Sequence, residues 1–208
     1  MAQQFSEAAA LMDNGKAPRT ARGEKTMRKI LDAALAEFGE KGFSESSIVS
    51  ITTRAKVALG TFYTYFDSKE ALFAALVRDM SRQVKELVPP PSEGRDAMDA
   101  ELRTQRAYLE FVATHKEVYR IIDEAEFVDP EGFKAHYEAA ASRIAARLAA
   151  GVESGQLRPA DKFETEVHSW AYMGMNVFLG LRFGVWSKED PAKIAEIANR
   201  LLRRGLEA

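Results

Sequence analysis

Residues 47–73 (SIVSITTRAKVALGTFYTYFDSKEALF) constrain the fold of this chain more than any other stretch. Their first part predicts a short helix with one apolar face, formed by Ile48, Ile51, Ala55 and Val57. A turn and a very short second segment follow, in which residues 60–66 carry hydroxyl groups and aromatic rings. Because this segment presents Thr, Tyr and neighbouring Lys in place of a carboxylate cluster, the pattern predicts a helix-turn-helix whose second helix enters the DNA major groove.

The net charge of −2 is unevenly distributed. Residues 16–85 contain 13 Lys and Arg against 8 Asp and Glu, whereas residues 86–208 contain 16 against 21. A basic N-terminal third joined to an acidic remainder is typical of a DNA-binding module attached to a part that does not touch DNA.

The helix-turn-helix resembles the DNA-binding signature of the TetR/AcrR family of bacterial transcriptional regulators. The resemblance covers about residues 25–75 and is carried by Ile51, Ala55, Val57, Gly60, Thr61, Tyr63, Tyr65, Phe66, Ser68, Lys69, Glu70, Leu72 and Phe73. Lys56 stands where the family commonly has Gly, so we expect it in a left-handed conformation. Ala58 stands where the family commonly has Ser, so the second helix lacks a capping side chain.

Nine residues are candidates for contact with double-stranded operator DNA: Ser47, Lys56, Leu59, Gly60, Thr61, Tyr63, Thr64, Tyr65 and Lys69. Thr61 and Thr64 have hydroxyl groups for bases or phosphates, and the phenols of Tyr63 and Tyr65 suit phosphates. Lys69 resembles the phosphate-binding lysine of the family.

Several neighbouring roles stay open at this point. Leu59 and Phe62 suit either the core or the DNA groove, and Tyr65 suits either a phosphate contact or the core. Arg28 and Arg54 are further phosphate candidates, or ordinary solvated charges.

We expect three segments along the chain. Residues 1–23 form a flexible basic arm, residues 24–75 the helix-turn-helix domain, and residues 76–208 a ligand-binding and dimerisation domain. The arm is either a solubilising tail or a segment whose cations reach phosphates or the minor groove.

The rest of the chain keeps a helical pattern with no alternating strand segment, which predicts an all-α fold. We expect helices near 95–113, 116–127, 130–153, 161–186 and 190–206. The fourth is apolar on all sides, so other helices must pack against both of its sides. We therefore expect residues 161–206 of two chains to form a four-helix dimer interface, and the inner side of the fourth helix to close a cavity.

Aromatic and Met side chains with a few polar groups around that cavity suit a small apolar or aromatic effector. The candidates are Arg106, Tyr108, Phe111, Tyr119, Ile122, Glu126, Phe127, Tyr137, Trp170, Met173 and Val177. Each of them taken alone is better explained as a core residue, and the prediction of a pocket rests on their number. Residues 119–137 are faintly similar to family members that answer to fatty acids or acyl-coenzyme A thioesters.

Nothing in the sequence predicts an enzyme, a cofactor or a metal site. The three histidines lack ligand-like spacing, and neither a Gly-rich phosphate loop nor a nucleophile elbow occurs. The absence of Cys fits a reducing cytoplasm. The most apolar run, residues 170–186, is too short and interrupted to span a membrane, so we expect a cytoplasmic protein without membrane contact.

The resemblance implies a homodimeric repressor that occupies a roughly palindromic operator and leaves it when a small molecule binds. The alternative is a DNA-binding regulator without a small-molecule ligand, controlled by partner proteins, whose aromatic interior is plain core.

Overall fold

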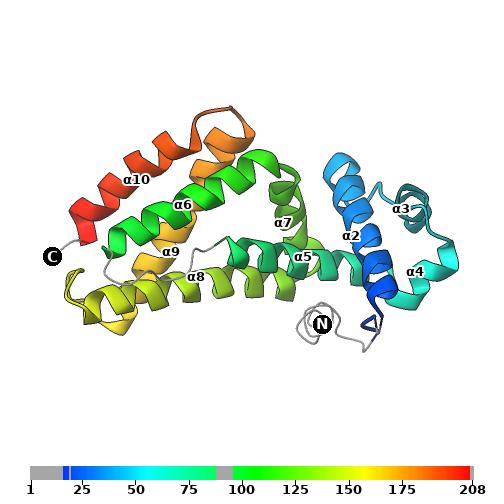
Figure 1. Ribbon diagram of the computed structural model, residues 1–208, viewed down its shortest axis with the longest axis horizontal. Helices are drawn as coiled ribbons and strands as arrows, with labels where there is room; N and C mark the ends of the chain where they lie inside the picture. Colours follow the sequence, from blue (N-terminus) through cyan, green and yellow to red (C-terminus); the bar gives the residue numbers. More distant parts are fainter. Residues whose placement is uncertain (1–15, 19, 88–95, 207–208) are drawn as a thin grey trace. The chain divides into compact units, whose positions relative to one another are not determined.

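The computed structural model describes residues 16–18, 20–87 and 96–206, and within these ranges the chain forms helices and no strand (Figure 1). The predicted all-α fold is therefore confirmed. The helices are α2 (Ala21–Lys41), α3 (Ile48–Ala55), α4 (Leu59–Tyr65), α5 (Lys69–Glu86), α6 (Ala97–Thr114), α7 (Glu117–Val128), α8 (Pro130–Glu153), α9 (Lys162–Leu179), the π-helical η1 (Gly180–Val185) and α10 (Pro191–Leu206).

The first described helix, α2, begins earlier than expected. Thr20 caps it, since its Oγ1 accepts a hydrogen bond from the Gly23 N–H at 3.1 Å. The helix ends at Lys41 and is followed by the cap residue Gly42, whose φ of +83° suits a glycine. Residues 21–23 thus belong to α2 and not to the expected arm, while residues 1–15 and 19 of that arm lie outside the described residues.

The chain divides into two units. The first runs to Arg82 and also includes residues 117–136, which form α7 and the start of α8. The second consists of residues 83–116 and the chain from Tyr137 onward. The expected boundary between the DNA-binding and ligand-binding domains at residue 76 stays a prediction. In the sequence, the two compact units meet later, at Arg82 in α5, and the first unit also contains α7.

Aromatic rings form the core of the first unit. The ring of Phe73 lies 5.3 Å from that of Phe38 and 5.1 Å from that of Phe43, measured between centroids. Phe62 and Phe66 lie 5.7 Å apart and are buried beneath α4. Phe62, ambiguous in the sequence, is therefore a core residue that anchors α4.

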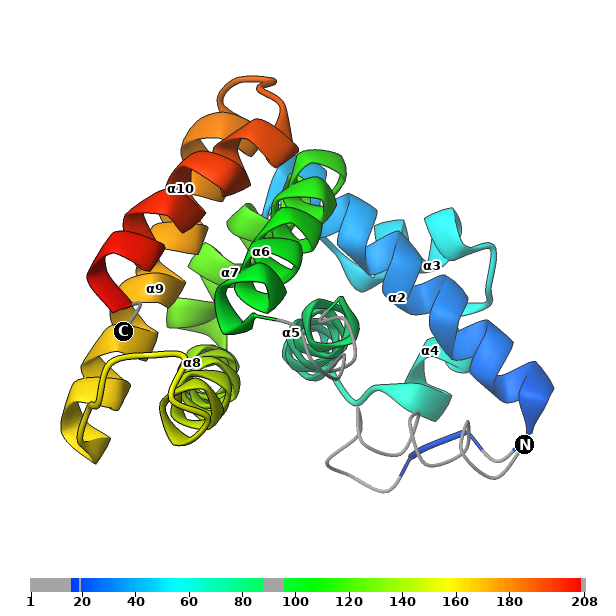
Figure 2. The ribbon, with the colours of Figure 1, turned by 60° about the vertical axis from the view of Figure 1, so that its left-hand side comes forward.

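The second unit has an apolar core crossed by polar pairs. The core consists of Met98, Ala141, Ile144, Leu148, Leu157, Tyr172 and Met173. Arg147, which is partly exposed, forms an ion pair with the buried carboxylate of Glu101, and the Tyr172 hydroxyl donates to the Glu101 carbonyl at 3.2 Å. Burial raises the pKa of Tyr172. These contacts join α6, α8 and α9, while α10 lies along α6 (Figure 2).

The predicted helix over 161–186 is α9 followed by the π-helical turn η1. Gly184 of η1 lies close to α6, since a Cβ there would be 3.3 Å from Val112 Cγ1. Large apolar side chains remain exposed on these last helices: Phe163, Val167, Phe178, Trp186, Ile197 and Leu201. The apolar helix is thus covered on one side only within a single chain.

A buried carboxylate joins α2 to α5 in the first unit. Asp79 accepts hydrogen bonds from Arg28 at 2.5 Å and from Arg82 at 2.6 Å, and its side chain is fully buried. Burial raises the pKa of Asp79, but the bonds from the two arginines lower it by more, so the pKa ends below its ordinary value of 3.8. This stabilisation is present at neutral pH and is lost as the pH falls through the folded-state pKa.

We predict that Asp79→Asn lowers the free energy of unfolding by about 3 kcal/mol at neutral pH, because both arginines lose a buried partner. Asp32→Asn is the matched control, since Asp32 is the exposed partner of the same Arg28 and should contribute less than about 1 kcal/mol. Urea unfolding followed by circular dichroism measures both variants. Equal effects, or a deficit of Asp79→Asn that does not shrink at acid pH, would contradict the prediction.

Candidate nucleic-acid interface

The turn between α3 and α4 is formed by Lys56. Its φ of 56° and ψ of 45° are left-handed, as predicted, and it is the one non-glycine residue with positive φ in the described part of the chain. The Val57 N–H closes the turn on the Thr52 carbonyl at 3.0 Å. A left-handed conformation costs a non-glycine residue about 1 to 2 kcal/mol. The turn therefore holds an exposed cation between the two helices at some loss of stability.

The side chains of α4 divide into two faces. The buried face consists of Phe62, Tyr65 and, just past the helix end, Phe66. The exposed face consists of Leu59, Gly60, Tyr63 and Thr64, with Thr61 half-buried at its edge. Leu59 and Tyr63 are each about half exposed, at 47% and 48%. This face offers hydroxyl groups, one apolar contact and one position without a Cβ, which suits close approach to base edges and phosphates.

Tyr65 is buried, with 8% of its surface exposed, so it belongs to the core beneath α4. A phosphate contact from this residue, which the sequence predicted, would have to come from the hydroxyl tip alone. Ala58 makes no side-chain cap to α4, as predicted.

Two other predicted DNA contacts also hold the domain together. Ser47 caps α3, because its Oγ accepts a hydrogen bond from the Ser50 N–H at 3.0 Å. Lys69 Nζ donates to the carbonyls of Phe43 at 2.7 Å and Ser46 at 2.8 Å. One of its three N–H donors then remains for a phosphate. Their contacts with DNA stay predictions.

The additional phosphate candidates Arg28 and Arg54 are engaged within the protein. Arg28 belongs to the Asp79 cluster. Arg54 makes two hydrogen bonds to Glu40, at 2.8 and 2.5 Å, and these hold the pKa of Glu40 below its usual value. Both arginines thus have carboxylate partners that a phosphate would have to replace.

Of the expected arm, Lys16 is described and contacts the end of α4. Its Nζ donates to the Tyr63 carbonyl at 3.3 Å and pairs with Asp67. A basic residue from before α2 therefore lies beside the exposed face of α4.

Comparison with known proteins agrees with this geometry. Residues 30–76 match the family described as bacterial regulatory proteins, tetR family. The HTH-type transcriptional regulator YdgC of Bacillus subtilis is 27% identical over 186 residues, which cover 87% of this chain and 93% of YdgC. Residues 30–76 therefore form the DNA-binding domain of a TetR-type regulator.

Solved structures share this fold over most of the chain. A transcriptional regulator from Aquifex aeolicus VF5 superposes with a TM-score of 0.68 at 21% identity, over 86% of this chain and 98% of that one. SmeT, in complex with triclosan, superposes with a TM-score of 0.68 at 19% identity, over 88% and 92% of the two chains.

The TetR relatives are regulators of transcription, and this chain is likewise a DNA-binding regulator and not an enzyme. Among the residues that the structure describes, no cluster of three or more His, Cys, Asp or Glu side chains is arranged to hold a metal ion. None of the described helices combines the length and apolar character needed to cross a membrane.

Sequence patterns missed the part that α7 has in the DNA-binding unit of this TetR-type regulator. Arg120 Nη1 donates to the carbonyls of Gly39 at 3.1 Å and Glu40 at 2.9 Å, at the C-terminal end of α2. Glu124 Oε2 accepts from the Phe43 N–H at 2.8 Å. A cation at a helix C-terminus is also favoured by the helix dipole. These partners lie about 80 positions apart in sequence, so no local pattern reports them.

The predicted effector residues do not all fall in one unit. Four of them, Tyr119, Ile122, Glu126 and Phe127, belong to α7 in the first unit. The others, Arg106, Tyr108, Phe111, Tyr137, Trp170, Met173 and Val177, belong to the second unit. Phe127 is 83% exposed, and Arg106 pairs with Glu110 at 2.8 Å on the surface of α6. Their shared role as effector contacts stays a prediction.

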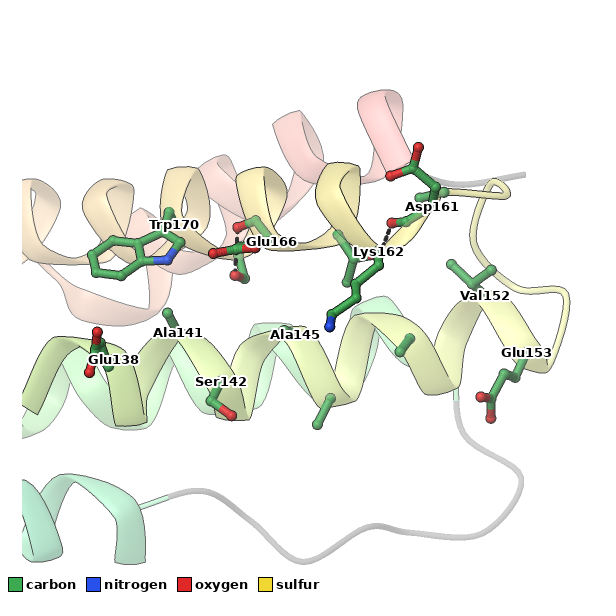
Figure 3. A pocket seen from close by; sticks show the side chains of 15 residues that line it. Glu138, Ala141, Ser142, Ala145, Val152, Glu153, Asp161, Lys162, Glu166 and Trp170 are labelled. Atoms are coloured by element: carbon green, nitrogen blue, oxygen red, sulfur yellow. Dashed lines mark hydrogen bonds between the residues drawn. The ribbon is translucent and has the colours of Figure 1, made fainter. Parts of the chain in front are cut away.

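One predicted effector residue, Trp170, lines an open groove between α8 and α9 (Figure 3). The rest of the lining differs from the aromatic surroundings that the sequence suggested. Ala141, Ala145 and Ala149 face the groove from α8, because they recur every fourth residue on one side of that helix.

Gly60 provides a test of the exposed face of α4. A Cβ at this position would meet no atom of the protein within 4 Å, so Gly60→Ala should raise the free energy of unfolding by about 0.5 to 1 kcal/mol. If DNA approaches the backbone here, the same methyl group should weaken binding to a duplex selected by the wild-type protein by about tenfold or more.

Gly205→Ala is the matched control, since its Cβ also meets nothing within 4 Å and lies in α10. Thermal unfolding and fluorescence anisotropy with labelled duplex measure the two effects. A more stable Gly60→Ala variant that binds DNA as tightly as wild type would remove Gly60 from the interface.

Proposed function

We propose that this TetR-type regulator is a homodimeric repressor that binds a roughly palindromic operator and is released from it by a small apolar or aromatic molecule. The observation that carries the proposal is that one chain has both an exposed polar face on α4 and an uncovered apolar face on α9, η1 and α10.

The apolar face supports dimerisation. Phe178, Trp186 and Leu201 are each about two-thirds exposed, at 69%, 69% and 67%. A group of large exposed apolar side chains usually marks an interaction surface. Two copies of the same helices would cover one another in a four-helix arrangement with two-fold symmetry.

Two-fold symmetry also suits DNA recognition. Two copies of α4 held about 34 Å apart would meet two successive major-groove faces of a palindromic site. A ligand that favours a conformer with a different separation would release the operator without touching DNA. The coupling cannot exceed the difference in ligand affinity between the two conformers.

The coupling can use α7. Because α7 contacts the C-terminal end of α2 through Arg120 and the following turn through Glu124, a displacement of α7 changes the support of the helix-turn-helix. α7 is joined covalently to α6 and α8 at its two ends.

We predict that Leu201→Glu converts the dimer to a monomer, since an unpaired carboxylate in an apolar interface should raise the dimer dissociation constant by at least about 100-fold. The monomer should lose its preference for a palindromic duplex. Phe127→Glu is the control, because it places the same charge on an exposed apolar residue of α7. Sedimentation velocity and anisotropy titrations measure both properties, and a dimeric Leu201→Glu variant would contradict this interface.

Release by a small molecule is tested by a thermal-shift screen of apolar acids, amines and aromatic compounds, followed by operator release with each stabilising compound. SmeT, which has the same fold and binds triclosan, supports including aromatic compounds. At least one compound should both raise the melting temperature and dissociate the operator complex. Intact operator binding without any stabilising compound would favour the alternative of control by partner proteins.

A further inference from the structure

The groove between α8 and α9 has a volume of about 720 Å³ and opens to solvent (Figure 3). This volume lies within the range of small-molecule sites. Alanines line its α8 wall, and Trp170 of α9 lies at one end of it. The exposed face of α4 has no part in it, and the α8 wall lies outside the apolar face of α9, η1 and α10.

The charged side chains that line the α8–α9 groove are mostly acidic. There are four carboxylates, from Glu138, Glu153, Asp161 and Glu166, and one ammonium group, from Lys162. Asp161 also caps α9, since its carboxylate accepts from the Glu164 N–H at 2.9 Å.

The two ends of the α8–α9 groove differ in charge. Lys162 reaches from α9 toward α8 near Ala145, on the side of the groove where Asp161 and Glu153 lie (Figure 3). Trp170 lies at the other end with Glu138 and Glu166 (Figure 3). Since Lys162 and Trp170 are eight residues apart on α9, the two ends are about 12 Å apart. The Trp170 end is therefore the more acidic one.

We propose that the α8–α9 groove binds a lipophilic cation, with an alkyl chain along the alanine wall and an ammonium group at Trp170. The face of an indole ring attracts a cation, and the carboxylates of Glu138 and Glu166 add to that attraction. The alanine wall removes the alkyl chain from water. This inference deepens the proposed function by naming an effector chemistry, and rests on it only for the step from binding to operator release.

The same charges disfavour the other occupants. An anionic acyl chain would bring its carboxylate into a groove with four acidic groups and one lysine. A second copy of this surface would bring like charges together, which weakens association. The cation is the occupant whose charge complements the groove.

Trp170 makes binding directly observable. The chain has two tryptophans, so Trp186→Phe leaves Trp170 as the only one. We expect dodecyltrimethylammonium, below its critical micelle concentration, to change the Trp170 fluorescence of this variant in a saturable way. Dodecanoate, with an alkyl group of similar length and the opposite charge, should bind at least about tenfold more weakly.

Two further changes in the same background test the location. Glu138→Gln with Glu166→Gln should weaken binding of the cation about threefold to tenfold. Glu131→Gln with Glu189→Gln, two exposed glutamates outside the groove, is the matched control and should leave the affinity unchanged. Ala145→Leu fills the groove without a change of charge and should abolish binding.

Three results would overturn the proposal. The first two are equal affinity for dodecanoate and unchanged affinity for the cation in the Ala145→Leu variant. The third is a dimer in which the cation does not change Trp170 fluorescence and acrylamide does not quench it, because the second copy would then occupy the groove. All of these measurements are made without DNA. Failure of the proposed repressor function would appear separately, as absence of operator binding or of release.

Discussion

The DNA-binding unit depends on the turn that follows α2, whose backbone groups are bonded by side chains of α5 and α7. Glu124 of α7 accepts the Phe43 N–H, and Lys69 of α5 donates to the Phe43 carbonyl from within the same unit. Lys69 also holds the Ser46 carbonyl, directly before Ser47 caps α3. Because buried backbone groups must be paired, movement of either α5 or α7 has to be followed by the turn and by the start of α3.

This arrangement gives regulation a physical route. The recognition helix α4 is anchored by buried aromatic rings and cannot move independently of the helices beneath it. Its position relative to a second copy therefore changes with its whole unit, α7 included. Close packing makes such a unit respond by shifting between discrete arrangements rather than by gradual deformation. A ligand then needs only a different affinity for two arrangements, and a contact with DNA is unnecessary.

Local features of this chain were largely predictable from sequence, and distant contacts were not. Apolar spacing located the helices to within a few residues. The departures of Lys56 and Ala58 from the residues common in the family predicted a left-handed turn and an uncapped helix, both confirmed. The role of α7 was missed because Arg120 and Glu124 act on carbonyl and amide groups about 80 residues away. The aromatic effector site expected from the sequence stays a prediction, whereas the open groove between α8 and α9 depends on small residues of α8 that no apolar pattern had singled out.

Ion pairs and hydrogen bonds within the protein reduce the number of cations in the basic N-terminal third that can contact DNA phosphates. Arg54 is held by Glu40, Arg28 by Asp79, and Lys69 by two backbone carbonyls, so these cations neutralise or satisfy groups of the protein itself. Counterion release on DNA follows from the cations that remain available to phosphates and not from the number in the sequence. The exposed Lys56 in the turn is one such cation. We expect specificity to come mainly from the hydroxyl groups and the open backbone of α4, because the buried aromatic rings beneath it fix which of its side chains face outward.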